Sequence, residues 1–246
     1  MNLVKNTKSL AAVSSLIIAT STAHAFTLDW SNVDYTDGSL SQTFTNVDGS
    51  GVDMTFDFTF SGGAASIAGT PHDQVWGGSQ ISTNYGESDA PLTFAFDPID
   101  ANQFMDLKIT FSQAVSGVDF NIYDIDADDG SNGRGFYGDV LDITANAGTV
   151  FAGMSAGSGI TAAGSTLTGG ITSAQDPGQL GNTANIDFGT VSVSSIDIRY
   201  SSTADFADPT FQMAAVGNID FSQVPEPTSA MLLLTGGALL GLRRRR

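Results

Sequence analysis

Cysteine is absent from the 246-residue sequence, and histidine is almost absent. Without cysteine there is no disulfide framework, and thiol catalysis and thiolate metal sites are excluded. The two histidines are His24 and His72, and the first falls in a terminal segment that we expect to be removed. A single remaining histidine cannot form a two-histidine zinc site. We therefore interpret His72 as a surface loop residue and expect the protein not to be an enzyme.

Basic residues are scarce once the two ends of the chain are set aside. Residues 26–223 contain only Lys108, Arg134 and Arg199 against 25 of the 26 acidic residues, so this part carries about −22, whereas the whole chain carries −17. Such a surface repels phosphate backbones, which argues against nucleic acid as a partner. It suits divalent cations. Nearly all of these acids are aspartate, a residue favoured in turns and in loop-borne cation sites.

The first 25 residues have the organisation of a secretion signal. A basic start precedes an apolar run at 10–19, and Ala23 and Ala25 occupy the small-x-small positions of a cleavage site. The run is shorter than the roughly 20 residues that span a bilayer. We expect a signal helix that signal peptidase removes, so that the mature chain begins at Phe26.

The last residues form a second targeting segment. It opens with Val224, Pro225, Glu226 and Pro227, continues with 15 uncharged residues and ends with Arg243, Arg244, Arg245 and Arg246. Two prolines prevent a regular helix or strand at the start. The uncharged stretch would be about 22 Å long as a helix, which is short for a hydrocarbon core of roughly 30 Å. The arginines are expected to stay cytoplasmic. We predict a short transmembrane helix that is inserted transiently and then cut.

These three parts, in this order, resemble the PEP-CTERM sorting signal of Gram-negative bacteria, a tail also classified as an ice-binding protein C-terminal domain. The resemblance implies recognition by exosortase and cleavage near Pro225, Glu226 and Pro227. It also implies a membrane-inserted precursor and a mature protein at the cell surface or in the extracellular matrix, in an exopolysaccharide or biofilm context. It covers residues 224–246 and implies nothing about the domain before them.

Alternating polarity dominates the middle of the chain. Residues 52–60 have Val, Met or Phe at every even position and Asp or Thr at every odd one, which is typical of a half-buried strand. The same period recurs at 91–97, 105–112, 117–124, 139–146, 184–188, 191–200 and 211–221, and more weakly at 26–30, 40–47 and 148–152. Short strands separated by Gly, Ser, Asn and Asp predict an all-β, antiparallel β-sandwich of jelly-roll type.

Three long loops are expected, at 61–90, 125–138 and 154–182. The last is rich in Gly, Ser, Thr and Ala, and we interpret it as a loop within one domain, residues 26–223, rather than as a linker. Long loops in compact domains are often functional. No internal repeat is present, which argues against solenoids, including ice binders with a regular threonine lattice.

The densest polar feature follows the predicted strand 117–124. Asp124, Asp126 and Asp128 alternate and are followed by Asp129. Three carboxylates aimed into one loop suit Ca²⁺, which takes six to eight oxygen ligands. This is not an EF-hand, because Asp129 stands where such a loop requires glycine. The sequence favours a calcium site in a sandwich loop, closed by Asp139 or a backbone carbonyl. A solvated acidic turn is the alternative.

Aromatic residues in the first two loops suggest a ligand platform. Trp76, Tyr85 and Tyr137 can stack against sugar rings, because aromatic side chains combine large apolar area with a polar group. They can equally cap the core of the sandwich. Glycoside hydrolysis needs two carboxylates at a set separation, and 25 acidic residues supply too many pairs to identify one.

Together these features predict an exported, non-catalytic protein of the cell surface or matrix that binds polysaccharide and Ca²⁺. Two alternatives stay open. One is a secreted hydrolase that uses aspartate to act on polysaccharide, and the other is a surface protein that binds ice or protects against salt stress.

Overall fold

The computed structural model describes residues 25–62, 64–66, 70–71, 91–100, 102–130, 136–170, 180–203 and 212–224. The predicted signal helix and transmembrane helix lie outside these ranges. Within them the protein has strands and two short 3₁₀ helices, all strand pairs are antiparallel, and no helix is long and apolar enough to cross a membrane. The predicted all-β antiparallel sandwich is confirmed.

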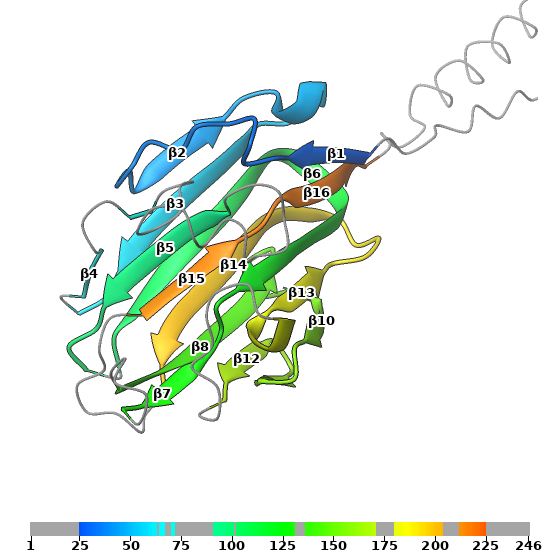
Figure 1. The fold of residues 1–246 in the computed structure, drawn as a ribbon. Helices are drawn as coiled ribbons and strands as arrows, with labels where there is room; N and C mark the ends of the chain where they lie inside the picture. Colours follow the sequence, from blue (N-terminus) through cyan, green and yellow to red (C-terminus); the bar gives the residue numbers. More distant parts are fainter. Residues whose placement is uncertain are drawn as a thin grey trace, which may run out of the picture.

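The strands and 3₁₀ helices follow one another along the chain (Figure 1). In order they are β1 (Ala25–Leu28), β2 (Ser41–Phe44), η1 (Val47–Gly49), β3 (Met54–Phe60), β4 (Ala65–Ser66), β5 (Leu92–Asp97), β6 (Phe104–Tyr123), β7 (Ala127–Asp129), β8 (Phe136–Ala145), β9 (Val150–Phe151), β10 (Gly153–Ala156), β11 (Ile160–Ala163), β12 (Thr166–Gly169), η2 (Leu180–Asn182), β13 (Ala184–Asp187), β14 (Val193–Ser202), β15 (Gln212–Val216) and β16 (Ile219–Gln223).

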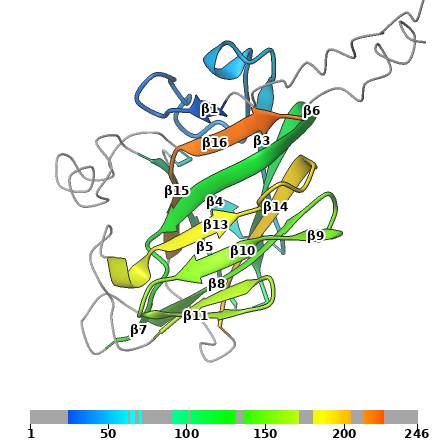
Figure 2. The same ribbon diagram turned by 90° about the vertical axis from the view of Figure 1, so that its right-hand side faces the viewer.

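Strand β6 holds the two layers together, because its two halves pair with different strands. Its first half lies between β3 and β14, and its second half pairs with β13 and β16. Gly117, with φ of 62°, lies between the halves, in a conformation that glycine adopts without steric cost. A register shift in β16 faces the same point. Figure 2 shows the second half of β6 running beside β16 and β13.

The first layer is a broad sheet in the order β2, β3, β6, β14, β8, β12, β11. In the second layer, β10 and β13 lie on one side of β6, and β16 and β1 lie on the other. Strand β15 pairs with the end of β6 and with β5. The two ends of the domain meet at one corner, because Ala25 of β1 is the register partner of Ser222 of β16 (Figure 1).

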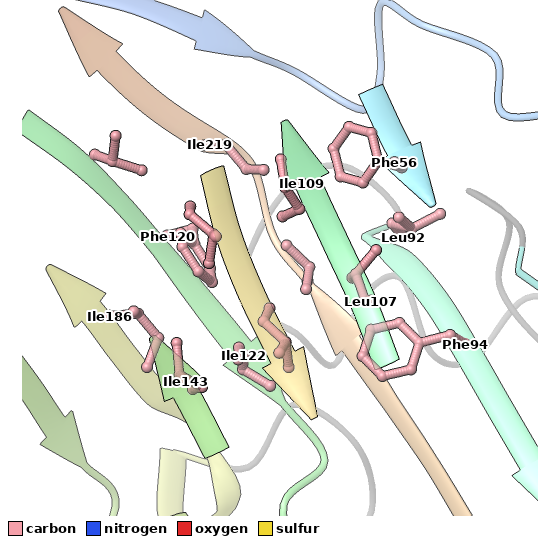
Figure 3. Packing of buried hydrophobic residues seen from close by; sticks show 14 of the residues in the cluster. Phe56, Leu92, Phe94, Leu107, Ile109, Phe120, Ile122, Ile143, Ile186 and Ile219 are labelled. Carbon is pink, nitrogen blue, oxygen red and sulfur yellow. The ribbon is translucent and has the colours of Figure 1, made fainter. Parts of the chain in front are cut away.

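The core lies between the layers. Figure 3 shows labelled side chains from both of them, among them Phe56, Ile109, Ile186 and Ile219, and all of these belong to one cluster of buried apolar residues. The alternation predicted for 52–60 is confirmed in β3, where Met54, Phe56 and Phe58 are buried. Burying one such side chain contributes about 1.5–3 kcal/mol, so the even positions of β3 are a main source of stability.

Several boundaries differ from the prediction. The predicted strands 105–112 and 117–124 are one strand, β6, and the predicted strand 211–221 is two, β15 and β16. The segment 154–182 is not a loop throughout, since β10, β11, β12 and η2 lie in it. These strands were missed because small and polar residues give little hydrophobic alternation. Likewise, the segment 125–138 contains β7 and the start of β8.

Candidate functional sites: an outer groove and a buried acidic cluster

A groove of about 550 Å³ lies on the outer face of β3, β6, β14 and β8, and most of the residues that line it are polar. Each strand contributes an aspartate and, two residues later, Thr, Lys or Arg. Alternate residues of a strand share a face, so both point outward while the apolar residue between them is buried. The pairs are Asp57 and Thr59 from β3, Asp106 and Lys108 from β6, Asp142 and Thr144 from β8, and Asp197 and Arg199 from β14.

The register of the four strands arranges these side chains in two rows. One row is Asp57, Lys108, Asp197 and Thr144, and the other is Thr59, Asp106, Arg199 and Asp142. Side chains directly opposite on neighbouring antiparallel strands have Cβ atoms roughly 4.5–5.5 Å apart. Acidic groups therefore alternate with a basic or hydroxyl group across the groove.

Arg199 is fixed in place at one side of the groove. Its Nε and Nη2 donate to the two carboxylate oxygens of Asp106 at 2.8 and 2.9 Å, and its guanidinium carbon lies 3.7 Å from the centre of the Phe104 ring. The hydrogen bond to Asp106 raises the pKa of Arg199, against the lowering effect of partial burial. The guanidinium is a charged and oriented donor at the groove.

Lys108 and Asp197 face each other in the other row. Lys108 is exposed and, within the described residues, takes part in no ion pair. The Oδ2 atom of Asp197 is buried and has no hydrogen-bond partner in the described part of the chain. The groove thus presents the exposed ammonium group of Lys108 to a ligand, beside the carboxylate of Asp197. No aromatic side chain of the described residues lines it.

A second polar site, the acidic cluster, is buried at one end of the sandwich and centres on Asp139 of β8. The side chain of Asp139 is only 1% exposed. Its Oδ1 accepts hydrogen bonds from the hydroxyl of Tyr200 at 2.6 Å and from Nε2 of Gln212 at 3.1 Å. Its Oδ2 accepts from the backbone N–H of Asp126 at 3.0 Å. Strands β8, β14 and β15 therefore converge on one carboxylate.

Asp124 and Asp126 supply the other acids of the cluster. Asp124 directly follows β6 and has φ of 66°, a left-handed conformation that Asp tolerates better than most residues. This turn leads to Asp126, whose backbone oxygen accepts from the N–H of Asp139 at 2.9 Å. The next residue after the turn, Ile125, donates its N–H to the carbonyl of Asn182 in η2 at 3.0 Å. Both Asp124 and Asp126 are buried.

The buried acids act on each other electrostatically. Burial, and then the negative charge of Asp126, raise the pKa of Asp139 well above its usual range, although the hydrogen bonds from Tyr200 and from the Asp126 backbone lower it. Burial and the charge of Asp126 also raise the pKa of the Tyr137 hydroxyl, which hydrogen-bonds Asp126. Tyr137, proposed from sequence as a sugar-stacking residue, therefore belongs to the acidic cluster.

The predicted calcium ligands are only partly brought together. Asp124, Asp126 and Asp139 lie in the cluster, while Asp128 uses Oδ1 to accept from the N–H of Gly130 at 2.8 Å, and Asp129 is exposed. No group of three or more Asp, Glu, His or Cys side chains in the described ranges is arranged to hold a metal ion. Asn182 and Gln212, which the sequence did not suggest, direct their amide nitrogens at Asp124 and Asp139.

Several predicted residues lie outside the described ranges, namely Trp76, Tyr85 and His72, the cleavage residue Ala23, Pro225, Glu226 and Pro227 of the sorting motif, and the four terminal arginines. Ala25 is the first residue of β1, and Val224 directly follows β16. The sequence also contains Gly-x-Ser-x-Gly at 153–157. The structure places Ser155 within β10, paired with Asn185, and not at the strand-to-helix turn of a nucleophile elbow.

Comparison with known proteins identifies the end of the chain. Residues 223–246 match the model of the PEP-CTERM protein-sorting motif. The chain carries a PEP-CTERM sorting motif. The motif implies processing by exosortase, export, and a location at the cell surface or outside the cell. It begins at the last residue of β16, so it follows the sandwich without an intervening element.

The remaining comparisons leave the central domain unassigned. No curated protein matches the chain. Among solved structures, the N-terminal domain of the Streptococcus gordonii adhesin Sgo0707 is similar at 13% identity and a TM-score of 0.31, covering 87% of this chain. The chain spans 60% of that domain's length.

Proposed function

We propose that this exported protein is a non-catalytic, polysaccharide-binding component of the cell surface or matrix of a Gram-negative bacterium, and that calcium supports its fold. The observation that carries the proposal is the outer groove, in which carboxylates, an ammonium, a guanidinium and hydroxyls alternate in register. Its precursor would be held in the inner membrane by the sorting tail until exosortase cuts it.

The chemistry of the groove favours a neutral, hydroxyl-rich chain. Carboxylates accept and cationic groups donate hydrogen bonds, so the two rows can satisfy neighbouring hydroxyls of a sugar in both senses. Four aspartates against two basic groups leave the groove acidic, and this repels uronic acids. Since no described aromatic ring lines it, hydrogen bonding rather than stacking would provide the affinity.

The absence of hydrolysis is part of the proposal. A glycosidase needs one carboxyl group that protonates the leaving oxygen and a second that acts as base or nucleophile. In the groove, both carboxylate oxygens of Asp106 already accept hydrogen bonds from the guanidinium of Arg199, so this carboxylate is not free to act on a sugar.

Glycan binding by the protein secreted from cells that express the full chain tests this function. We expect retention on neutral polysaccharide in affinity electrophoresis, weaker retention on alginate, and no release of reducing ends. The double variant Lys108→Ala/Asp197→Asn should weaken binding at least tenfold, since hydrogen bonds to charged groups are worth about 1.5–3 kcal/mol. Asp220→Asn, which removes an exposed charge on β16 in the other layer, is the matched control.

Two outcomes contradict the proposal. Equal binding by wild type and the double variant would show that the groove is not the glycan-binding site. Release of reducing ends that one Asp→Asn change in the groove abolishes would make the protein a hydrolase.

A further inference from the structure

The first layer ends in two edge strands, β2 on one side and β11 on the other, because in the described part of the chain each of them pairs with a single strand. An edge strand presents unpaired backbone N–H and C=O groups to a second chain. Natural proteins usually protect such edges with charged side chains, proline or a bulge. The two edges of this sheet differ in that protection.

The β2 edge is surrounded by acidic side chains. Ser41 of β2 donates its hydroxyl to Oδ1 of Asp57 at 2.6 Å. Asp34 and Asp37 are exposed in the loop that leads to the strand. The backbone carbonyl of Asp34 accepts from Nε2 of Gln42 at 2.6 Å, which holds this loop against β2. An acidic molecule that approached this edge would be repelled.

The β11 edge has no protection of this kind. Its exposed residues Thr161, Ala162 and Ala163 are uncharged, the strand contains no proline or lysine, and its pairing with β12 runs without a bulge. Figure 2 shows β11 at the margin of the molecule. Ala162 is exposed although its register partner Leu167 is fully buried. A small apolar residue on the inner side of a sheet is exposed in this way because the sheet ends there.

The backbone of Ala162 points away from the sheet. The N–H of Gly170 donates to the carbonyl of Gly159 at 2.8 Å, in the same register as β11 and β12. Hydrogen-bonded and non-hydrogen-bonded pairs alternate along antiparallel strands, so Thr161 and Ala163 bond to β12 and Ala162 directs its N–H and C=O outward. Within the described residues neither of these two groups has a partner.

The chain around this edge is almost neutral, unlike the rest of the domain. Residues 143–186, which include β9 to β12, contain one charged residue, Asp176, whereas residues 26–223 carry about −22. A basic partner would be attracted to the acidic surfaces instead, and a neutral partner does not need a neutral contact. A strongly acidic partner, however, can approach closely only where the charge is absent. A second copy of this chain is such a partner.

We propose that two copies of the protein associate through β11, which pairs antiparallel with β11 of the second copy about a two-fold axis at Ala162. The contact is isologous, so the two Ala162 residues would exchange two backbone hydrogen bonds. Thr161 of each copy would lie opposite Ala163 of the other. The first layers of the two copies would then form one continuous antiparallel sheet.

The contact is small, so the association should be weak and reversible. A strand of four residues buries less than the roughly 1,200 Å² of a stable interface. Two bodies of about −22 also repel each other, and salt screens this repulsion over a Debye length of about 8 Å at physiological ionic strength. Screening does not weaken an uncharged contact. Salt should therefore strengthen the dimer, whereas it would weaken the binding of a basic partner.

The dimer would have two outer grooves on one side. The two-fold axis of an antiparallel strand pair is perpendicular to the sheet, so the outer faces of both copies point the same way. One polymer could then occupy both grooves, which raises the overall affinity without a new contact. This consequence rests on the proposed function, whereas the association itself does not.

Sedimentation equilibrium of the processed, secreted protein, without glycan and from micromolar to millimolar concentration, measures the association. We expect a monomer–dimer equilibrium whose Kd falls severalfold when NaCl is raised from about 0.05 M to about 0.5 M.

Ala162→Pro tests the strand pairing. It removes the outward N–H, and an edge strand tolerates proline at such a position. The dimer should weaken about tenfold or more, because two backbone hydrogen bonds are lost, while the urea midpoint at low concentration stays near that of wild type. Thr43→Pro is the matched control. The N–H of Phe58 donates to the carbonyl of Leu40 at 2.8 Å, so Thr43 has the equivalent outward position on β2, and this variant should dimerise like wild type.

Charge at the contact gives a second test that does not involve proline. Thr161→Asp/Ala163→Asp places like charges directly opposite each other across the two-fold axis and should abolish the dimer. Thr161→Asp/Ala163→Lys changes the same two exposed positions but places opposite charges face to face, so it should dimerise at least as well as wild type.

A wild-type protein that stays monomeric up to millimolar concentration would overturn the inference, and so would an unchanged Kd in Ala162→Pro. Longer assemblies that Thr43→Pro abolishes would also overturn it, since they would show β11 pairing with β2 of the next copy in an open chain. The groove variant Lys108→Ala/Asp197→Asn should dimerise like wild type. Association and glycan binding are thus measured separately, and either proposal can fail alone.

Discussion

Arg199 and Asp106 face each other across β14 and β6, joined by two parallel hydrogen bonds, with the guanidinium over the ring of Phe104. Lysine cannot reproduce the two-pronged contact or the same stacking. We expect Arg199→Lys to destabilise the protein by about 1 kcal/mol, because exposed pairs contribute about 0.2–1 kcal/mol and the ring contact adds a similar amount. Urea unfolding measures this.

A double-mutant cycle with Asp106→Asn supplies the control for this pair. The double variant should lose less free energy of unfolding than the two single variants lose in sum, since either change alone breaks the same contact. Strictly additive losses would show that the pair contributes nothing to stability.

Gly169 of β12 lies against the backbone of Asp126. A Cβ atom there would be 2.7 Å from Cα of Asp126 and would overlap its carbonyl group. Backbone cannot move aside as a flexible side chain can, so Gly169→Ala should cost about 1–3 kcal/mol, the usual penalty of overpacking. Thr161→Ala, at an exposed position of the neighbouring β11, is the comparison and should change stability by less than about 0.5 kcal/mol. Similar midpoints in urea for both variants would contradict the close packing.

Tyr35 should make the fold sensitive to alkaline pH. Burial, and then the charge of Asp57, raise the pKa of its hydroxyl, which donates to the carbonyl of Ser39 at 2.9 Å. A raised folded-state pKa means that the native protein holds this proton more tightly than the unfolded chain. The contribution to stability is therefore constant below the unfolded pKa of about 10 and is lost as pH rises beyond it.

Tyr35→Phe tests this by removing the ionisable group while keeping the ring. It should cost about 1 kcal/mol at pH 7 through the lost hydrogen bond. Above pH 10 the difference from wild type should shrink or reverse. Stability curves that stay parallel from pH 7 to pH 11 would show that the pKa of Tyr35 is the same in the folded and the unfolded chain, which would contradict the raised pKa.

Processing at both ends can be read by mass spectrometry of the native protein. We expect an N-terminus at Phe26, whose ring centre lies 5.8 Å from that of Phe221 and keeps β1 in place without Ala25. We also expect a C-terminus near Pro225 and Glu226, and retention of the intact tail in cells that lack exosortase. An intact tail in exosortase-containing cells would contradict cleavage.

The sequence predicted the fold class because β3, and β14 from Ile196 onward, alternate between buried and more exposed residues and contribute to the core. It predicted a break at 113–116 between two strands, but β6 continues through these residues, where Val115 pairs with both β14 and β16. Strands β10 to β12 could not be found in this way, since most of their residues are small and at least half-exposed, and only Ile160, Leu167 and Gly169 among them are buried.

The candidate sites were predictable to different degrees. The density of aspartate after β6 pointed to the acidic cluster, and Asp139 was named as its closing residue. Asn182 and Gln212 gave no signal, because Asn182 lies in a glycine-rich segment that looks like an ordinary loop and Gln212 lies in the predicted strand 211–221. The groove corresponds to a pattern in the sequence: in four strands an Asp is followed two residues later by Thr, Lys or Arg. Its two rows depend on strand register, which only the three-dimensional structure supplies.

The pairing of Ala25 with Ser222 has a mechanical consequence. Because β1 begins where β16 ends, tension between the two chain ends would open the β1–β16 ladder one hydrogen bond at a time, which requires little force. Tension between the C-terminal end and a polymer bound in the groove would instead act along β16 and the long strand β6. It would load the hydrogen bonds between these two strands together, in shear. A protein pulled in this second direction holds its load far longer than one pulled apart at its ends.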